Sequence, residues 1–234
     1  MLASLTRFRR MVRGACDYRW RPEFRDPWGG PFNDQAARVA LFRSLLEAFH
    51  PWAIVETGAF RGTTTEFFAR TGLPVFSAEA DAYAFGFSWM RMRPYRNATV
   101  LHGDSRAVLR KCLAGPAWLA HGSNPFFYLD AHWRDDLPLA EEIDIVFGRC
   151  PDAIVMIDDY AVPGDAGYAY DDYGPGKALD MAYIAPAVHA HKLAAFHPST
   201  PSARETGARR GCIVLVGAAR HETTLASLPL LRRA

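Results

Sequence analysis

The chain of 234 residues has little cysteine, which argues against folds held together by zinc or by disulfides. Its four cysteines are widely scattered and form no C-x-x-C pair: Cys16, Cys112, Cys150 and Cys212. Neither a zinc site nor a disulfide framework is therefore expected. A reducing, cytoplasmic location fits this use of cysteine.

The chain also lacks an excess of one charge and any long hydrophobic run. Its formal net charge at pH 7 is +2, so bulk electrostatics give no reason to expect nucleic-acid binding. No apolar stretch approaches the length that spans a bilayer, and arginines interrupt the apolar residues of the N-terminus. We therefore expect neither a transmembrane segment nor a secretory signal. The length and the 50% hydrophobic content suit one domain with a sizeable core.

Residues 1–33 are predicted to form a basic helix and a loop that precede the main domain. Apolar residues recur at near-helical spacing between residues 2 and 12, with arginines around them. A helix packed on the domain fits this pattern, and so does a helix that binds a membrane surface or a partner. The stretch 20–33 is rich in Pro, Gly and Trp, which indicates a loop. The main domain is expected to span residues 34–234.

A glycine turn between a predicted strand and a predicted helix is the clearest motif. The apolar run 53–55 indicates a buried strand, and it ends at Glu56 with Gly58 and Gly62 directly behind it. Such a turn lets a ligand approach backbone N–H groups closely, at the positive end of a helix. The alternative is a tight turn that only packs the helix against the sheet.

The residues within and after this turn restrict the possible ligand. Phe60 stands where a dinucleotide-binding fingerprint has its middle glycine, and this disfavours a diphosphate. Thr63 with Glu66 three residues later predicts a helix that begins with a capping box.

Strand and helix signals alternate along the rest of the chain, which predicts an α/β fold with a mostly parallel sheet. Further strands are predicted at 74–79, 98–102, 126–130 and 153–157, and at 192–196 and 211–217, which suit a closing antiparallel pair. Helices are predicted at 34–50, 81–93, 105–113, 137–147 and 178–191. The expected sheet has seven strands, an antiparallel last strand and helices on both faces.

Acidic residues follow the second and third of these strands. Glu79 is a candidate to accept hydrogen bonds from both ribose hydroxyls of a nucleotide, and its alternative is an exposed acid that caps the next helix. Asp104 is a candidate to bind an adenine amino group or to cap the following helix, and both roles can hold together. Ligands in open α/β sheets bind beyond the carboxyl ends of the strands, which favours the ligand roles.

Three carboxylates follow the fourth and fifth strands, which are expected to be neighbours. Asp130, Asp158 and Asp159 would repel one another at this edge unless a cation or a proton intervenes. A hard divalent ion such as Mg²⁺ would relieve that repulsion. The alternative is that one of these acids caps a loop or pairs with an arginine.

The motifs together resemble a known family of enzymes. The succession Glu-Thr-Gly-Ala-Phe-Arg-Gly, Ser-Ala-Glu, Gly-Asp-Ser, Tyr-Leu-Asp-Ala-His-Trp and Met-Ile-Asp-Asp-Tyr resembles class I S-adenosylmethionine-dependent methyltransferases. Within that fold it is similar to the bacterial group of macrocin-type O-methyltransferases and cephalosporin-hydroxylase-like proteins. The resemblance covers about residues 33–216 and implies a single Rossmann-like domain. Ala-His-Trp after Asp130 departs from the macrolide enzymes.

This resemblance implies roles for individual residues. The implied contacts of S-adenosylmethionine are Glu56, Thr57, Gly58, Phe60, Arg61, Gly62, Glu79, Asp104, Ser105 and Asp130. The implied ligands of a divalent metal, expected to be Mg²⁺, are Asp130, Asp158 and Asp159. The implied reaction is O-methylation of a sugar, another glycan or a small natural product.

A base must remove the proton of the acceptor hydroxyl. Asp130 and His132 are the candidates, and the alternative for His132 is a hydrogen-bonded packing residue. Aromatic residues are candidates to contact the acceptor: Trp133, Tyr160, Tyr168, Tyr170 and Tyr173. The last three lie in a long loop at 163–176, which suits a lid or a substrate wall, or a mobile surface loop.

Two other functions remain open at this stage. The same carboxylates would serve a metal-dependent hydroxylase on this fold, although the spacing of a histidine–carboxylate facial triad is missing. A non-catalytic protein that binds S-adenosylmethionine is the second rival. Charged residues at 204–210 are candidates to contact an anionic substrate or another subunit of a homo-oligomer, or to form a solvated loop.

Overall fold

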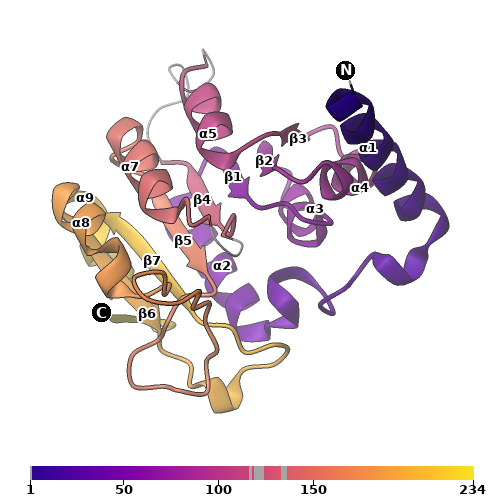
Figure 1. Ribbon diagram of the computed structural model, residues 1–234. Helices are drawn as coiled ribbons and strands as arrows, with labels where there is room; N and C mark the ends of the chain where they lie inside the picture. Colours follow the sequence, from indigo (N-terminus) through magenta and orange to yellow (C-terminus); the bar gives the residue numbers. More distant parts are fainter. Residues whose placement is uncertain (1, 116–117, 119–123, 133–135) are drawn as a thin grey trace.

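A single eight-stranded sheet forms the centre of the protein (Figure 1). The computed structural model describes residues 2–115, 118, 124–132 and 136–234. The strand order is β3-β2-β1-β4-β5-β7-β6-β8. The strands are β1 (Ile54–Thr57), β2 (Val75–Glu79), β3 (Ala98–His102), β4 (Phe126–Leu129), β5 (Ile154–Asp158), β6 (Leu193–Pro198), β7 (Cys212–Gly217) and β8 (Leu231–Arg233).

Strands β1 to β5 pair with one another in parallel, and β7 runs antiparallel to both β5 and β6. This confirms the predicted α/β class and the mostly parallel sheet. The predicted number of seven strands is one too low, because β8 also pairs antiparallel with β6. It has only three residues, two of them exposed arginines, so it gave no alternating apolar pattern.

Helices cover both faces of the sheet (Figure 1). They are α1 (Leu2–Trp20), α2 (Ala36–Phe49), α3 (Thr63–Ala69), α4 (Ala82–Met92), α5 (Ser105–Leu113), α7 (Leu139–Arg149), α8 (Met181–Ala190) and α9 (Ala218–Ala226). One buried cluster joins α2, α3 and α9 to one face, and a second joins α5, α7 and α8 to the other. Helix α9 was not among the predicted helices.

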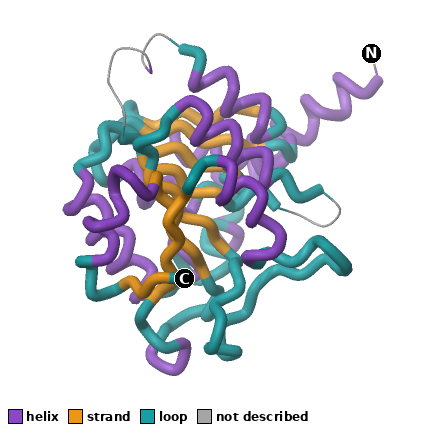
Figure 2. The backbone as a smooth tube through the Cα atoms, turned by 90° about the vertical axis from the view of Figure 1, so that its left-hand side faces the viewer, coloured by secondary structure: helices purple, strands orange, loops and turns teal. Residues whose placement is uncertain are grey.

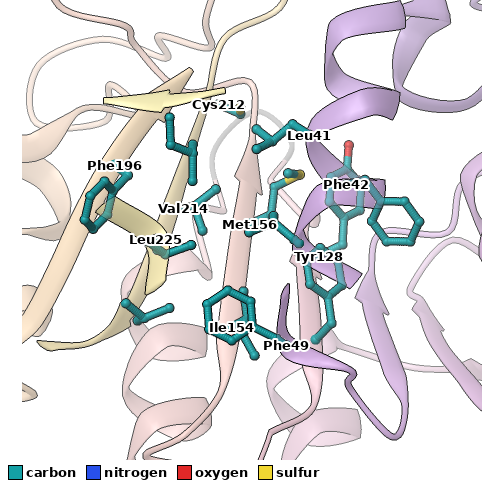
Figure 3. Packing of buried hydrophobic residues seen from close by; sticks show 14 of the residues in the cluster. Leu41, Phe42, Phe49, Tyr128, Ile154, Met156, Phe196, Cys212, Val214 and Leu225 are labelled. Atoms are coloured by element: carbon teal, nitrogen blue, oxygen red, sulfur yellow. The ribbon is translucent and has the colours of Figure 1, made fainter. Parts of the chain in front are cut away.

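Figure 3 shows how the first cluster is built from alternate residues of the central strands. Phe42 of α2 packs on Phe126 of β4, and Tyr128 and Met156 lie on the same face. Their neighbours in sequence, such as Phe127, belong to the other cluster. This alternation follows from the period of two in a strand, and it fixes which side chains reach which face at the strand ends.

The turn between β1 and α3 leaves no room for a side chain at its first glycine. Gly58 has φ +84°, and a Cβ atom there would lie 2.2 Å from the carbonyl oxygen of Asp130. Gly62 also has a positive φ, +74°, and serves as the N-cap of α3 without a side-chain hydrogen bond. The predicted capping box is therefore wrong: Thr63 donates to the carbonyl of Arg25, and Glu66 bonds Arg70 and other side chains.

The N-terminal helix is longer than predicted and packs on α4. At the crossing, a Cβ atom on Gly86 would lie 1.9 Å from the carbonyl oxygen of Met11, and one on Gly14 would lie 2.0 Å from that of Tyr83. The two backbones can approach this closely only because both residues are glycine. Figure 2 shows the start of α1 extending away from the body. Within the described residues, no helix combines the length and the apolar character needed to cross a membrane.

Candidate functional site

The predicted ligand residues lie at the carboxyl edge of the parallel strands. Register pairs Thr57 of β1 with Leu129 of β4, and Leu129 with Ile157 of β5. The residues that follow these three therefore leave the sheet at the same level. They form two groups, one beyond β1 and β2 around the glycine turn, and one beyond β4 and β5 that is strongly acidic.

Glu79 ties the end of β2 to the glycine turn. Its carboxylate accepts hydrogen bonds from the backbone N–H of Phe60 at 2.6 Å and of Asp81 at 2.7 Å. It is 8% exposed, and burial raises its pKa to about 7. Its alternative as an exposed helix cap is wrong, because Asp81 caps α4 by accepting from Tyr83 and Ala84.

Glu56 lies beneath the turn rather than on its surface. Its carboxylate is 1% exposed and accepts hydrogen bonds from the hydroxyls of Thr65 and Ser77. Burial raises the pKa of Glu56 to about 7, and these two hydrogen bonds oppose the rise. Glu56 therefore holds α3 and β2 against the end of β1.

The remaining residues of the glycine turn face different surroundings. Phe60 has φ +46° and is 44% exposed, so its ring stands at the surface of the turn. Arg61 donates to the carbonyl of Phe24 at 2.9 Å, which directs its side chain toward the N-terminal segment. Thr57 is fully buried, and its hydroxyl lies 3.3 Å from the backbone nitrogen of Asp130.

Asp104 and Ser105 lie at the end of β3. Asp104 is the N-cap of α5 and accepts from the backbone N–H of Arg106 and Ala107. The guanidinium of Arg106 also binds it and holds its pKa below the usual value. Ser105 is buried beside Glu142 of α7, whose pKa burial raises to about 7. The capping alternative for Asp104 is thus confirmed, and its adenine role stays a prediction.

The acidic group surrounds one buried imidazole, and we call Asp130, His132, Asp159 and Asp171 the acid–histidine cluster. Nε2 of His132 lies 3.6 Å from a carboxylate oxygen of Asp130, 3.7 Å from one of Asp159 and 3.7 Å from one of Asp171. The His132 side chain is 2% exposed, and its Nε2 has no hydrogen-bond partner among the described residues. Single donor atoms of Asp130, His132 and Asp159 all lie within 4.8 Å of one another.

Charges around the cluster are only partly balanced. Arg210 bridges Asp159 at 2.5 Å and Asp171. No arginine or lysine of the described residues pairs with Asp130. The Asp130 side chain is 32% exposed, but desolvation by the protein around it, followed by the charges of Asp158 and Asp159, raises the pKa of Asp130 above its ordinary value. This is the carboxyl group that gains most from a cation or a proton.

The structure does not bring Asp158 into this cluster, which corrects its prediction as a metal ligand beside Asp159. Asp158 ends β5 with its side chain on the α2 face, where it forms a buried ion pair with Arg38 and accepts from the hydroxyl of Tyr128. Burial opposes its ionisation, but Arg38 keeps the pKa of Asp158 below its ordinary value. The next residue, Asp159, has φ +52°, and the chain turns there toward His132.

The predicted substrate residues lie in different places. Tyr160 and Tyr168 are 1% and 4% exposed, so their predicted stacking on an acceptor does not fit their burial. Tyr170 is 42% exposed, and the hydroxyl of Tyr173 donates to Asp171 beside the cluster. Trp133, also predicted to contact the acceptor, lies outside the described residues.

Asp171 and Arg38 were not among the predicted site residues, and Arg210 was a candidate only for contact with an anionic substrate or another subunit. Asp171 lies in the tyrosine-rich loop, where no periodicity indicates which acid points inward. Arg210 belongs to a segment for which a solvated loop was one interpretation. Arg38 did have a signal, because it shares the buried face of α2 with Leu41 and Leu45 at helical spacing, and a charge there needs a buried partner.

Comparisons with known proteins give similar folds at low sequence identity. A candidate O-methyltransferase from Klebsiella pneumoniae has 15% identity and a TM-score of 0.52, with 89% of each chain covered. A protein studied for the conversion of a disulfide bond into a thioacetal group during echinomycin biosynthesis has 16% identity and a TM-score of 0.53, over 81% of this chain and 82% of that one. The methyltransferase domain of bacterial CtHen1 has 10% identity and a TM-score of 0.54, over 77% and 97%.

No protein-family model matches the sequence, and no curated protein matches it. Likeness at 10–16% identity shows a shared fold. The chain therefore has the Rossmann-like fold that these proteins share, and its chemistry has to be argued from its own residues.

Proposed function

We propose that this protein is an S-adenosylmethionine-dependent methyltransferase that methylates a hydroxyl group of a small-molecule or glycan acceptor. The observation that carries the proposal is the link between Glu79 and the N–H of Phe60. It places a carboxylate at the end of β2 against a glycine turn that has no room for a side chain at Gly58. A nucleoside with free ribose hydroxyls, and with no diphosphate, suits such a turn.

The expected contacts of the cofactor follow from this arrangement. Glu79 would accept hydrogen bonds from the ribose hydroxyls, and the turn 58–62 would present its backbone to the methionine part. Asp104 would lie near the adenine. The likeness in fold to proteins described as methyltransferases supports this assignment.

The acid–histidine cluster is the expected place of a divalent cation. Its donor set fits Mg²⁺ or Mn²⁺ through the carboxylates of Asp130 and Asp159 and the unpartnered Nε2 of His132. When bound, such an ion would lower the pKa of an acceptor hydroxyl and orient its oxygen. The carboxylate oxygen of Asp130 that does not bind the ion would accept the hydroxyl proton, while the oxygen bonds to the methyl carbon and the C–S bond breaks.

The hydroxylase alternative has less support from the side chains. Non-haem iron oxygenases use two histidines and one carboxylate. Among the described residues, the cluster has one histidine with three carboxylates. This donor set favours a redox-inert ion bound by oxygen ligands.

Calorimetric titration of the chelator-treated protein with S-adenosylmethionine, with and without Mg²⁺, tests the proposal. We expect binding in both conditions, and we expect Glu79→Gln to weaken it at least about tenfold, because the amide replaces one carboxylate acceptor. Glu47→Gln, at an exposed position of α2, is the matched control and should bind as the unchanged protein does. An absence of binding in both conditions would rule out the methyltransferase.

Screening acceptors with the S-adenosylmethionine-bound protein then separates an enzyme from a binding protein. Methyl transfer to a sugar or phenolic hydroxyl would support the O-methyltransferase assignment. Cofactor binding with no transfer to any hydroxyl acceptor would favour the non-catalytic alternative.

A further inference from the structure

The third carboxylate beside His132 comes from the tyrosine-rich loop between β5 and α8. Asp171 Oδ2 lies 3.7 Å from His132 Nε2, which is also the distance from Nε2 to Asp159 Oδ2. The backbone of Asp171 is fixed on both sides, because its N–H donates to the carbonyl of Asp159 at 2.9 Å and its carbonyl accepts from Leu179 at 2.9 Å. The carboxylate therefore has a defined place in the cluster.

Arg210 holds this carboxylate in position and is itself fixed by its backbone. The side-chain amide of Gln35 donates to the carbonyl of Arg210 at 2.9 Å and accepts from its N–H at 2.9 Å. Arg38 donates to the same carbonyl at 2.5 Å. Gln35 and Arg38 are both buried, so the guanidinium of Arg210 starts from a rigid point when it reaches Asp159 and Asp171.

The excess of carboxylates in the cluster matches the charge of one divalent cation. The three carboxyl groups of the cluster outnumber its single arginine, Arg210, by two. Asp158 does not change this balance, because Arg38 neutralises it. Two donors of one Mg²⁺ or Mn²⁺ ion lie at most about 4.2 Å apart when each bond is about 2.1 Å, and the distances from Nε2 to each of the three carboxylates are within this limit. The group whose donor atoms all lie within 4.8 Å of one another contains Asp130, His132 and Asp159 but not Asp171, so Asp171 would have to move toward the other two carboxylates when the ion binds.

We propose that Asp171 is a further ligand of the divalent-cation site and that Arg210 is the positioning residue that orients Asp171 and Asp159 toward it. The proposal rests on the metal site of the proposed function and adds a ligand from outside the strand ends. It also gives the tyrosine-rich loop a role, since Asp171, which accepts a hydrogen bond from Tyr173, would link this loop to the ion.

Binding of Mn²⁺ to the chelator-treated full chain, measured by electron paramagnetic resonance, tests the role of Asp171. We expect Asp171→Asn to weaken Mn²⁺ binding at least tenfold and to leave S-adenosylmethionine binding unchanged. Asp172→Asn is the matched control, because Asp172 is the next residue and its carboxylate accepts from the backbone N–H of Gly174 instead. It should bind Mn²⁺ as the unchanged protein does.

The outcomes separate this inference from the proposed function. Equal Mn²⁺ affinity in Asp171→Asn and the unchanged protein would overturn the role of Asp171. No Mn²⁺ binding to the unchanged protein would overturn the cation site as a whole, whereas intact S-adenosylmethionine binding would leave the methyltransferase proposal in place.

The variant Arg210→Gln tests whether Arg210 orients the two carboxylates or only adds positive charge near the ion. If Arg210 only adds positive charge, its removal should tighten Mn²⁺ binding, because a cation repels a cation. If it positions the two carboxylates, its removal should weaken binding several-fold. We expect the weaker binding, with Arg209→Gln, at an exposed position, as the unaffected control. Tighter binding by Arg210→Gln would overturn the positioning role.

Discussion

At the scale of single residues, Glu79 gives the expected cofactor site a dependence on pH. Burial raises the pKa of Glu79 to about 7, so the group is mostly protonated at pH 6 and mostly ionised at pH 8. Only the ionised form accepts hydrogen bonds with both oxygens. We therefore expect the affinity for S-adenosylmethionine to rise about tenfold between pH 6 and pH 8.

The same titration with Glu79→Gln identifies the group responsible. The variant should lack this tenfold component, and any remaining change with pH belongs to the ligand or to other groups of the protein. An identical pH profile in the variant would show that Glu79 does not titrate in the binding equilibrium.

A methyl group at Gly58 should destabilise the fold and disrupt the glycine turn. In Gly58→Ala the new Cβ atom would meet the backbone carbonyl of Asp130 at 2.2 Å, so β1 and β4 would have to separate at the site. Gly72→Ala is a close control, because the two glycines have φ of +84° and +83° and nothing lies within 4 Å of a Cβ atom at Gly72.

Chemical denaturation of the two variants measures the difference. Left-handed strain alone should lower the free energy of unfolding of Gly72→Ala by about 1–2 kcal/mol. We expect Gly58→Ala to lose about 2 kcal/mol more than that, together with cofactor binding. Equal losses in the two variants would show that the clash relaxes without consequence.

At the scale of elements, the crossing of α1 and α4 depends on Gly86 in the same way. A Cβ atom on Gly86 would lie 1.9 Å from the carbonyl oxygen of Met11, so Gly86→Ala should separate the two helices. We expect faster hydrogen exchange of α1 in this variant, with the exchange of the central strands unchanged. Gly148→Ala in α7 is the control, because nothing lies within 4 Å of a Cβ atom at Gly148, and the exchange of α1 should be unchanged in it. Unchanged exchange of α1 in Gly86→Ala would show that the crossing tolerates the methyl group.

The elements themselves were largely predictable, and the reason is that their signals are local. The apolar runs of β1, β2, β4 and β5 and the glycine turn after β1 needed no partner to be recognised. The absence of the expected capping box was not predictable, because Arg25, Arg70 and Arg91 form hydrogen bonds with Thr63 and Glu66. Competition of this kind depends on tertiary contacts that a local pattern does not contain.

At the scale of the whole molecule, the site was predictable only where it lies at strand ends. Asp130 and Asp159 follow strands, so the parallel sheet itself brings them together. Asp171 reaches the same point through a loop, and Arg38 reaches Asp158 across 120 positions of sequence. Asp158 ends β5 in phase with Ile154 and Met156, so the period of two directs it to the α2 face, where Arg38 pairs with it, whereas Asp159 lies just beyond the strand.

Removal of one partner from the buried ion pair of Arg38 and Asp158 should strongly destabilise the fold. Arg38 and Asp158 have side chains that are each 2% exposed, and the pair joins α2 to β5, with the hydroxyl of Tyr128 on β4 as a third partner. Removing one member of such a pair leaves a buried charge without compensation, which costs about 3–5 kcal/mol. We expect a loss of this size in the free energy of unfolding for Asp158→Asn.

A double-mutant cycle with Arg38→Met separates the pair from its surroundings. The double variant should be more stable than the sum of the single losses predicts, because no uncompensated charge remains. Glu222→Gln removes a carboxylate from the partly exposed pair with Arg233 and should cost less than about 1 kcal/mol. If Asp158→Asn unfolds as the unchanged protein does and loses Mn²⁺ binding instead, then Asp158 belongs to the cation site, and the assignment of Asp158 to the α2 face has to be abandoned.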